Sequence, residues 1–113
     1  FVKHPGASAR AHSIDVDAAN RFVIAADLGL DKVFVYRFDA SRGTLGEDPA
    51  FASLDAGAGP RHVALHPGGR FTYILNELSM TITAARSWRC HALACWLSPR
   101  GCLPLRPPAS ASC

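Results

Sequence analysis

Residues 62–71, His-Val-Ala-Leu-His-Pro-Gly-Gly-Arg-Phe, repeat the pattern of residues 13–22, Ser-Ile-Asp-Val-Asp-Ala-Ala-Asn-Arg-Phe, which lie 49 positions earlier. Each copy has an alternating segment, a tight turn and an Arg-Phe pair that opens a second segment rich in β-branched and aromatic residues. This order predicts a β-hairpin in both copies. Repeats of about 40 to 50 residues with strands of this kind are typical of β-propeller blades. The sequence therefore predicts an all-β protein built from repeated antiparallel units.

The first copy contains enough strand segments for a complete four-stranded blade over about residues 12–56. Its strands are expected at residues 13–16, 21–26, 32–38 and 50–54. The second copy starts at about residue 60, with strands expected at residues 62–65, 70–75 and near 80–83. Residues 1–11 are predicted to form a loop, with His4 in a mobile start.

The two copies are too few to close a propeller, which needs about four to eight blades. We therefore expect the chain to be a piece of a larger protein, and its first residue, Phe1 rather than Met, supports the same expectation. Missing neighbours leave sheet edges open and are expected to uncover apolar faces that carry Phe34, Tyr36 and Ile74. Because these sheet edges are open, we expect that the chain can associate with itself through them.

The strand pattern stops at about residue 84. Residues 84–113 hold all four Cys and both Trp residues, and no acidic residue follows Glu77. We expect this tail to be irregular and non-homologous, without a fourth strand on the third strand of the second copy. A shifted reading frame and a divergent native tail are the two alternatives. The Cys spacing lacks the close pairs typical of zinc sites, so no metal and no cofactor are expected.

The charge pattern excludes several classes of partner. Residues 1–77 carry eight Lys or Arg and nine Asp or Glu, so the net charge of +3 comes from the four Arg residues of the remainder. No basic stripe with interleaved aromatic residues accompanies it, which argues against nucleic acid as a partner. No apolar run approaches the roughly 18 residues of a membrane span, and no leader is visible, so we expect no membrane partner and a cytoplasmic location.

The hairpin register gathers polar residues at one end of the strands. If the second turn is centred at residues 67–69, Arg61 lies opposite Asn76 and beside Glu77, and the 49-residue offset places His12 opposite Asp27. A cation beside a carboxylate and an imidazole could hold an anionic substrate and activate water at the mouth of a propeller channel. The alternative is a plain cross-strand ion pair between Arg61 and Glu77.

Four motifs together resemble the lactonase family of seven-bladed β-propellers. They are His-Ser-Ile-Asp-Val-Asp at residues 12–17, Asp-Leu-Gly-Leu-Asp at 27–31, Gly-Pro-Arg-His at 59–62 and Asn-Glu-Leu at 76–78. The resemblance covers about residues 1–83, and it departs at Ala9-Arg10, where the family usually has Pro-His. That family includes bacterial 6-phosphogluconolactonases and fungal carboxy-muconate lactonizing enzymes.

The resemblance implies metal-independent lactone chemistry in a central cleft. Its proposed active-site His, Arg and Glu fall on His12, Arg61 and Glu77, and we expect Asp27, Asn76 and His62 to contact the substrate. The preferred function is hydrolysis of a small anionic, sugar-derived lactone in carbohydrate metabolism, with the isolated chain inactive. The alternatives are cyclisation of carboxy-cis,cis-muconate and a non-catalytic propeller that binds metabolites or partners.

Overall fold

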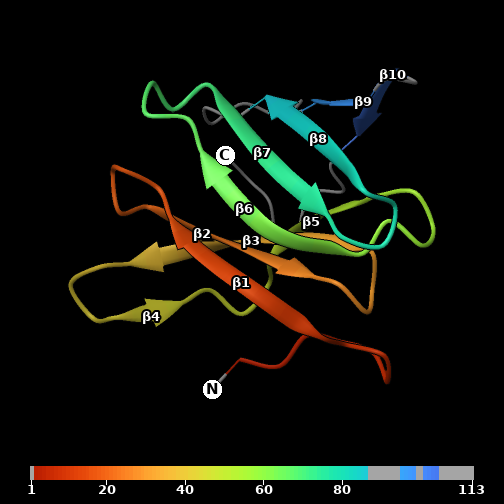
Figure 1. Ribbon diagram of the computed structural model, residues 1–113. Coiled ribbons are helices and arrows are strands. Elements are labelled where there is room, and N and C mark those ends of the chain that lie inside the picture. The colour runs from red at the N-terminus through yellow and green to blue at the C-terminus, as the bar shows by residue number, and fades with distance from the viewer. Residues whose placement is uncertain (1, 87–94, 99–100, 105–113) are drawn as a thin grey trace.

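The computed structural model describes residues 2–86, 95–98 and 101–104, which form two stacked antiparallel sheets and a small hairpin (Figure 1). The first sheet contains β1 (Ala11–Val16), β2 (Phe22–Asp27), β3 (Lys32–Asp39), β4 (Thr44–Leu45) and β5 (Ala50–Ser53). The second sheet contains β6 (Pro60–Leu65), β7 (Phe71–Asn76) and β8 (Thr81–Arg86). The hairpin pairs β9 (Cys95–Ser98) with β10 (Gly101–Pro104). The described part of the chain contains no helix long and apolar enough to cross a membrane.

The first sheet has the strand order predicted for a four-stranded blade. β1 pairs with β2, β2 with β3, and β3 with β5, all antiparallel. The structure adds the two-residue strand β4, which pairs with the end of β3 where only a turn was expected. The chain reverses there because the Asp39 carboxylate accepts hydrogen bonds from the Ser41 backbone, the Ser41 hydroxyl and the Arg42 backbone.

The two sheets repeat the same backbone path, as the sequence predicts. Ile14 pairs with Ala25 in the first hairpin, and the residues 49 positions later, Val63 and Ile74, pair in the second. The left-handed turn positions recur at the same offset. Asn20 has φ 53° and its equivalent Gly69 has φ 66°, while Asp31 has φ 52° and its equivalent Met80 has φ 53°.

The apolar core lies between the two sheets. From the first sheet it contains Ile24, Ala26, Val33, Val35 and Ala52, and from the second Val63, Ile74 and Ala85. These side chains alternate along their strands, so one face of each sheet is directed at the other. Burial of one large aliphatic side chain stabilises the fold by about 1.5–3 kcal/mol. The core therefore holds the two repeats together as one unit.

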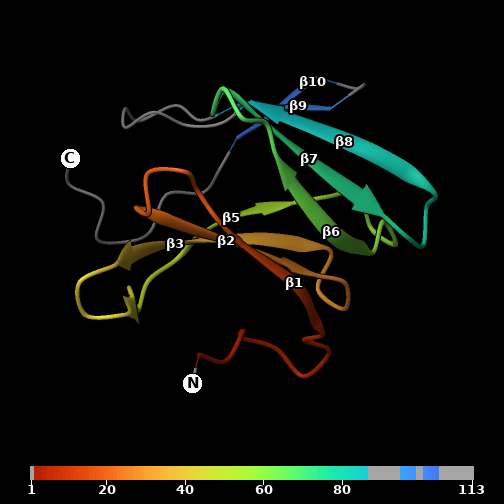
Figure 2. The ribbon, with the colours of Figure 1, turned by 60° about the vertical axis from the view of Figure 1, so that its left-hand side comes forward.

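The opposite face of the first sheet is covered as well, which corrects the expectation that Phe34, Tyr36 and Ile74 are uncovered. Phe34 and Tyr36 are each only 2% exposed, and Ile74 is fully buried between the sheets. The N-terminal segment lies across the far face of the first sheet (Figure 2), and the His4 ring packs on Phe34 at 4.2 Å between centroids. Strand alternation assigns residues to a face but gives no sign of the loop that covers it.

The third strand of the second repeat is longer than expected. β8 runs to Arg86, three residues beyond the predicted end at residue 83, and stays paired with β7 throughout. Ladder hydrogen bonds need only backbone groups, and Ala85 is small enough to enter the core, where it is 1% exposed. Within the described residues β8 pairs with β7. The expected absence of a fourth strand on β8 concerns residues 87–94, which lie outside the described residues, and it stays a prediction. Residues 87–94, 99–100 and 105–113 of the expected irregular tail lie outside the described residues, and the origin of the tail stays a prediction.

The core position of Ile74 makes a direct test of this packing. We expect Ile74→Ala to lower the free energy of unfolding by about 2–5 kcal/mol, because it leaves a cavity between the sheets. The matched control is Ile82→Ala in the same sheet, where the side chain is 65% exposed. We expect the control to cost about 0.5 kcal/mol or less. Urea unfolding followed by circular dichroism measures both, and equal losses would contradict the assigned core.

Candidate active site

Two β-bulges set the directions of the polar side chains at one end of the strands. The β1–β2 register shifts at His12, and the β6–β7 register shifts at Arg61, so each is the extra residue of its strand. The regular register that placed Arg61 opposite Asn76 and His12 opposite Asp27 is therefore wrong by one residue. The preceding residue of each strand takes that place instead. A bulge bends the strand and turns its extra side chain out of the ladder.

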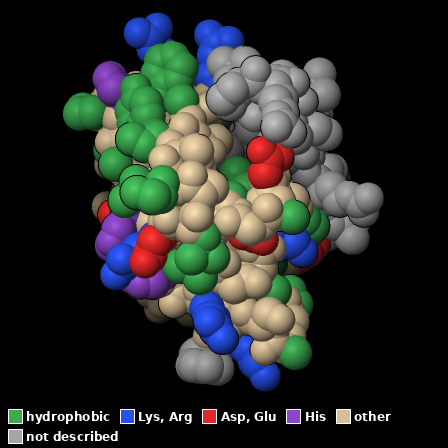
Figure 3. Space-filling model, turned by 45° about the vertical axis from the view of Figure 1, so that its right-hand side comes forward, with side chains coloured by type: hydrophobic (Ala, Val, Ile, Leu, Met, Phe, Trp, Pro, Cys, Tyr) green, Lys and Arg blue, Asp and Glu red, His purple; other side chains and the backbone are tan. Residues whose placement is uncertain are grey.

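The bulges bring side chains from both sheets into one group, which we call the Arg61 cluster: His12, Arg61, His62 and Glu77. Arg61 donates from Nε to His12 Nε2 at 3.0 Å, and its Nη1 lies 3.0 Å from Glu77 Oε2. The His62 ring stands edge-on to the His12 ring, with 5.4 Å between their centroids. Figure 3 shows histidine, basic and acidic side chains gathered together on the face that it draws. The structure thus unites the three predicted catalytic residues and one of the predicted binding residues.

The Arg61 cluster is open to solvent in this chain. The side chains of Arg61 and Glu77 are 40% and 43% exposed, so their ion pair contributes at most about 1 kcal/mol to stability. In its contact with Arg61, the Nε2 atom of His12 acts as the acceptor, so this nitrogen's lone pair is directed at the guanidinium group. A guanidinium group has five N–H donors, and these two contacts leave others for an anion.

Asp31 fixes the connection that leads into Arg61. Its carboxylate accepts hydrogen bonds from the backbone N–H groups of Gly57 and Gly59, each at 2.8 Å. The carbonyl of Gly59 in turn accepts from the backbone N–H of Glu77 at 2.9 Å. Gly59 has φ +62°, and a Cβ there would lie 2.4 Å from Cγ of Leu78, so the close approach requires glycine. Sequence reasoning assigned Asp31 no role, although it closes the Asp-Leu-Gly-Leu-Asp motif.

Asp27, a predicted substrate contact, is fully buried. Its carboxylate accepts hydrogen bonds from the backbone N–H groups of Arg10, Gly29 and Leu30 at 2.8, 3.1 and 3.0 Å. His4 Nδ1 lies 2.5 Å from its other oxygen. His4 is 7% exposed, so the expectation of a mobile start is wrong at this residue. A buried carboxylate requires such partners, which is the signal that could have pointed to His4.

Asn76, the second-repeat equivalent of Asp27, is also buried, with 2% exposure. Its side-chain amide donates to the hydroxyl oxygens of Thr81 and Thr83 at 3.0 and 2.8 Å. These bonds hold the turn between β7 and β8, on which Glu77 lies. In this structure Asp27 and Asn76 therefore support the loops that carry the Arg61 cluster, and their contact with a substrate stays a prediction.

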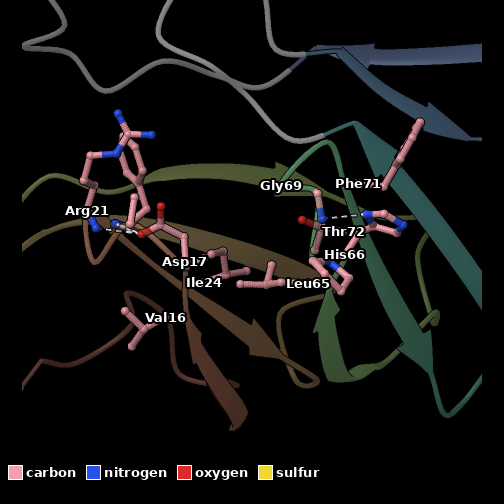
Figure 4. A pocket seen from close by; sticks show the side chains of 14 residues that line it. Val16, Asp17, Arg21, Ile24, Leu65, His66, Gly69, Phe71 and Thr72 are labelled. Atoms are coloured by element: carbon pink, nitrogen blue, oxygen red, sulfur yellow. Dashed lines mark hydrogen bonds between the residues drawn. The ribbon is translucent and has the colours of Figure 1, made fainter.

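A hollow of about 380 Å³ lies at the opposite ends of the same strands, between residues 17–21 and 66–69 (Figure 4). Two of its polar side chains, Asp17 and His66, are used by the turns themselves. Asp17 accepts from the backbone N–H groups of Arg21 and Phe22, and His66 Nδ1 accepts from the backbone of Gly68. In the Arg61 cluster, by contrast, polar and charged side chains from the two repeats contact each other. The Arg61 cluster is therefore the better candidate site.

Comparison with known proteins agrees with this arrangement of repeated sheets. The family described as "Lactonase, 7-bladed beta-propeller" matches residues 2–97. The chain belongs to this lactonase family. A 6-phosphogluconolactonase of Xenorhabdus nematophila is 37% identical over 78 residues, which cover 68% of this chain and 24% of that protein. A 6-phosphogluconolactonase of Bacillus subtilis is 40% identical over 65 residues, which cover 58% of this chain and 18% of that protein.

Solved structures show the same fold over nearly the whole lactonase-family chain. A Lactobacillus plantarum protein superposes with a TM-score of 0.63 and 25% identity over 92% of this chain. A Bacteroides fragilis protein superposes with the same TM-score of 0.63 and 22% identity over 93% of this chain. In both cases the match covers 28% of the longer protein. The chain thus supplies about two blades and spans about a quarter of the length of such relatives.

The buried phenol of Tyr36 gives a pH test of the region around Asp27. Burial, and then the charge of Asp27, raise the pKa of Tyr36 above its usual value of 10.0. The folded state therefore disfavours the phenolate. The resulting stabilisation is complete below pH 10 and is lost as the pH rises through the raised pKa.

We expect ultraviolet titration of tyrosinate to show one tyrosine ionising above its usual pH, and Tyr36→Phe to abolish that step. The second tyrosine, Tyr73, remains in this variant as an internal control. A late step that survives in Tyr36→Phe would contradict the assigned burial.

Proposed function

We propose that the chain is part of a lactonase that hydrolyses a small anionic sugar lactone of the 6-phosphogluconolactone class, and that the Arg61 cluster belongs to its active site. The supporting observation is that one guanidinium group contacts an imidazole from the first repeat and a carboxylate from the second. This arrangement occurs in a chain whose relatives in Xenorhabdus nematophila and Bacillus subtilis are 6-phosphogluconolactonases. A phosphorylated substrate of this kind also favours a cytoplasmic location.

Lactone hydrolysis adds water to the ring carbonyl carbon and breaks the ring C–O bond. In our proposal the carboxylate of Glu77 accepts a proton from the attacking water, and Oε2 of this carboxylate already lies beside Arg61. The carbonyl oxygen becomes negatively charged and is stabilised by N–H donors of Arg61. When the ring bond breaks, the proton returns from Glu77 to the ring oxygen, which leaves as the hydroxyl group of the product acid.

His12 has two possible parts in this reaction. Its Nε2 atom accepts the hydrogen bond from Arg61 and so holds Arg61 in place, and after release from Arg61 the same nitrogen could accept the proton from water. Both roles of His12 depend on its hydrogen bond with Arg61. We therefore expect loss of Arg61 to affect the reaction most. His62, which contacts the His12 ring, lies where it could bind the anionic part of the substrate.

Substitutions in the corresponding full-length protein test the proposed roles. We expect Arg61→Ala and Glu77→Gln each to lower kcat/KM for 6-phosphogluconolactone by on the order of a hundredfold or more. The control is Arg70→Ala, an exposed arginine next to the turn at the far end of the strands, with turnover near that of the unmodified protein. Normal turnover in both cluster variants would reduce the Arg61–Glu77 contact to a structural ion pair. Turnover of carboxy-cis,cis-muconate in place of the lactone would overturn the substrate class.

The isolated chain is expected to have negligible lactonase activity. The side chains of Arg61 and Glu77 are 40% and 43% exposed, and in water a contact between two charges is worth only about 1 kcal/mol. We expect turnover of 6-phosphogluconolactone by the purified 113-residue chain to equal that of the Arg61→Ala chain. A rate for the unmodified chain that approaches that of a full-length relative would show that the two repeats alone suffice.

A further inference from the structure

Asp31 holds the connection between the two repeats with three of its oxygen atoms. Its backbone carbonyl accepts from the backbone N–H of Leu54 at 2.8 Å, where the connection from β5 to β6 begins. Its carboxylate accepts from the backbone N–H groups of Gly57 and Gly59, each at 2.8 Å and each on a separate oxygen. These glycines lie 26 and 28 positions after Asp31, so its side chain joins the β2–β3 turn to the entry of the second repeat.

The same connection also fixes the turn between β7 and β8. The Gly59 carbonyl accepts from the backbone N–H of Glu77 at 2.9 Å, and the Ala58 carbonyl accepts from that of Ser79 at 3.2 Å. Gly59 is followed, after one buried proline, by Arg61 at the bulge of β6. The β2–β3 turn, the β5–β6 connection and the β7–β8 turn therefore meet at one end of the sheets, on the right of Figure 1. The carboxylate on the β2–β3 turn thus fixes the backbone next to both members of the Arg61–Glu77 ion pair.

The turn that contains Asp31 does not itself need a carboxylate. Asp31 has φ 52°, and Met80, its equivalent 49 positions later, takes the same left-handed conformation with φ 53°. The thioether of methionine is only a weak acceptor for backbone N–H groups. The left-handed turn therefore forms without a carboxylate, and the Asp31 carboxylate serves the N–H groups of Gly57 and Gly59 instead.

We propose that Asp31 is a positioning residue of the active site, which holds Arg61 and Glu77 in the relative placement that the reaction needs. This inference rests on the proposed function of the Arg61 cluster. The side chains of Arg61 and Glu77 are 40% and 43% exposed, and an ion pair in solvent is too weak to fix two long side chains by itself. The backbone beneath them must supply that order, and Asp31 fixes this backbone. A misplacement of about 1 Å in a reacting group can cost about a hundredfold in rate.

Substitutions of Asp31 in the corresponding full-length protein test this role through kcat and KM for 6-phosphogluconolactone. We expect Asp31→Ala to lower kcat by about ten- to a hundredfold and to leave KM nearly unchanged, because the displaced groups act in the transition state. Asp31→Asn keeps one acceptor oxygen, so its kcat should lie between those of Asp31→Ala and the unmodified protein. The Asn variant also repeats the test if circular dichroism shows that the Ala variant has lost its strands.

Asp39→Ala is the matched control. The Asp39 carboxylate also accepts hydrogen bonds from backbone N–H groups, those of Ser41 and Arg42, in a turn of the first sheet. This turn has no printed contact with the Arg61 cluster, so we expect kcat of the control to equal that of the unmodified protein.

A double variant separates positioning from a general loss of structure. If Asp31 acts through Arg61, Asp31→Ala should slow the Arg61→Ala protein by a smaller factor than it slows the unmodified protein. A general loss of structure would slow both proteins by the same factor.

Hydrogen–deuterium exchange gives a readout that is independent of activity. In Asp31→Ala the amides of Gly57 and Gly59 lose their acceptor, and the amide of Glu77, which is bound to Gly59, should exchange faster with them. In Asp39→Ala the exchange of these three amides should stay as in the unmodified protein.

The outcomes distinguish this proposal from the proposed function. A normal kcat in Asp31→Ala beside a slow Arg61→Ala protein would overturn the positioning role and leave the proposed function in place. An equal factor in the two backgrounds, or unchanged exchange at Glu77, would also overturn the positioning role. Normal turnover in Arg61→Ala would overturn both, and it is measured without any change at Asp31.

Discussion

The apolar contact between the two sheets is the interaction on which the rest of this structure depends. Side chains such as Ile24 and Val33 from the first sheet meet Ile74 from the second, and water is excluded between them. His12 belongs to the first sheet, whereas its partner Arg61 belongs to the second. Their hydrogen bond gains little in solvent, so it cannot hold the sheets together. The core fixes the sheets, and the Arg61 cluster forms because the strand ends are then adjacent.

Two carboxylates, those of Asp27 and Asp31, fix the loops at the ends of the strands. Asp27 is fully buried and is satisfied by three backbone N–H groups and by His4, while Asp31 ties the turn of the first repeat to the connection that precedes Arg61. Loop backbone groups need such acceptors when no neighbouring strand supplies them. These contacts fix the loops relative to the core, and the fixed loops hold the polar side chains of the Arg61 cluster in place.

The strands that the two repeats share form the scaffold, and residues that differ between the repeats form the Arg61 cluster. The bulge at His12 recurs at its equivalent Arg61, so both repeats turn a side chain out of the ladder at the same place. The residues differ, however, and Glu77 stands where the first repeat has Leu28. Identical side chains at these positions would place like charges together. Because the two repeats carry different residues at these equivalent positions, a cation, a carboxylate and an imidazole come into contact there.

The sequence by itself determined the repeat, the order of its strands, the faces of Val33 and Phe34, and the grouping of His12, Arg61 and Glu77 at one strand end, because alternation and hairpin pairing are local rules. The bulges, the burial of His4 and the cover over Phe34 and Tyr36 were decided only by the tertiary structure. Each bulge is at the second residue of its strand, so only one residue precedes it, and that is too short a segment for the alternation to reveal a shift of one position. The contact between His4 and Asp27 spans 23 positions and follows from the need of a buried carboxylate for a donor, which depends on what the fold encloses.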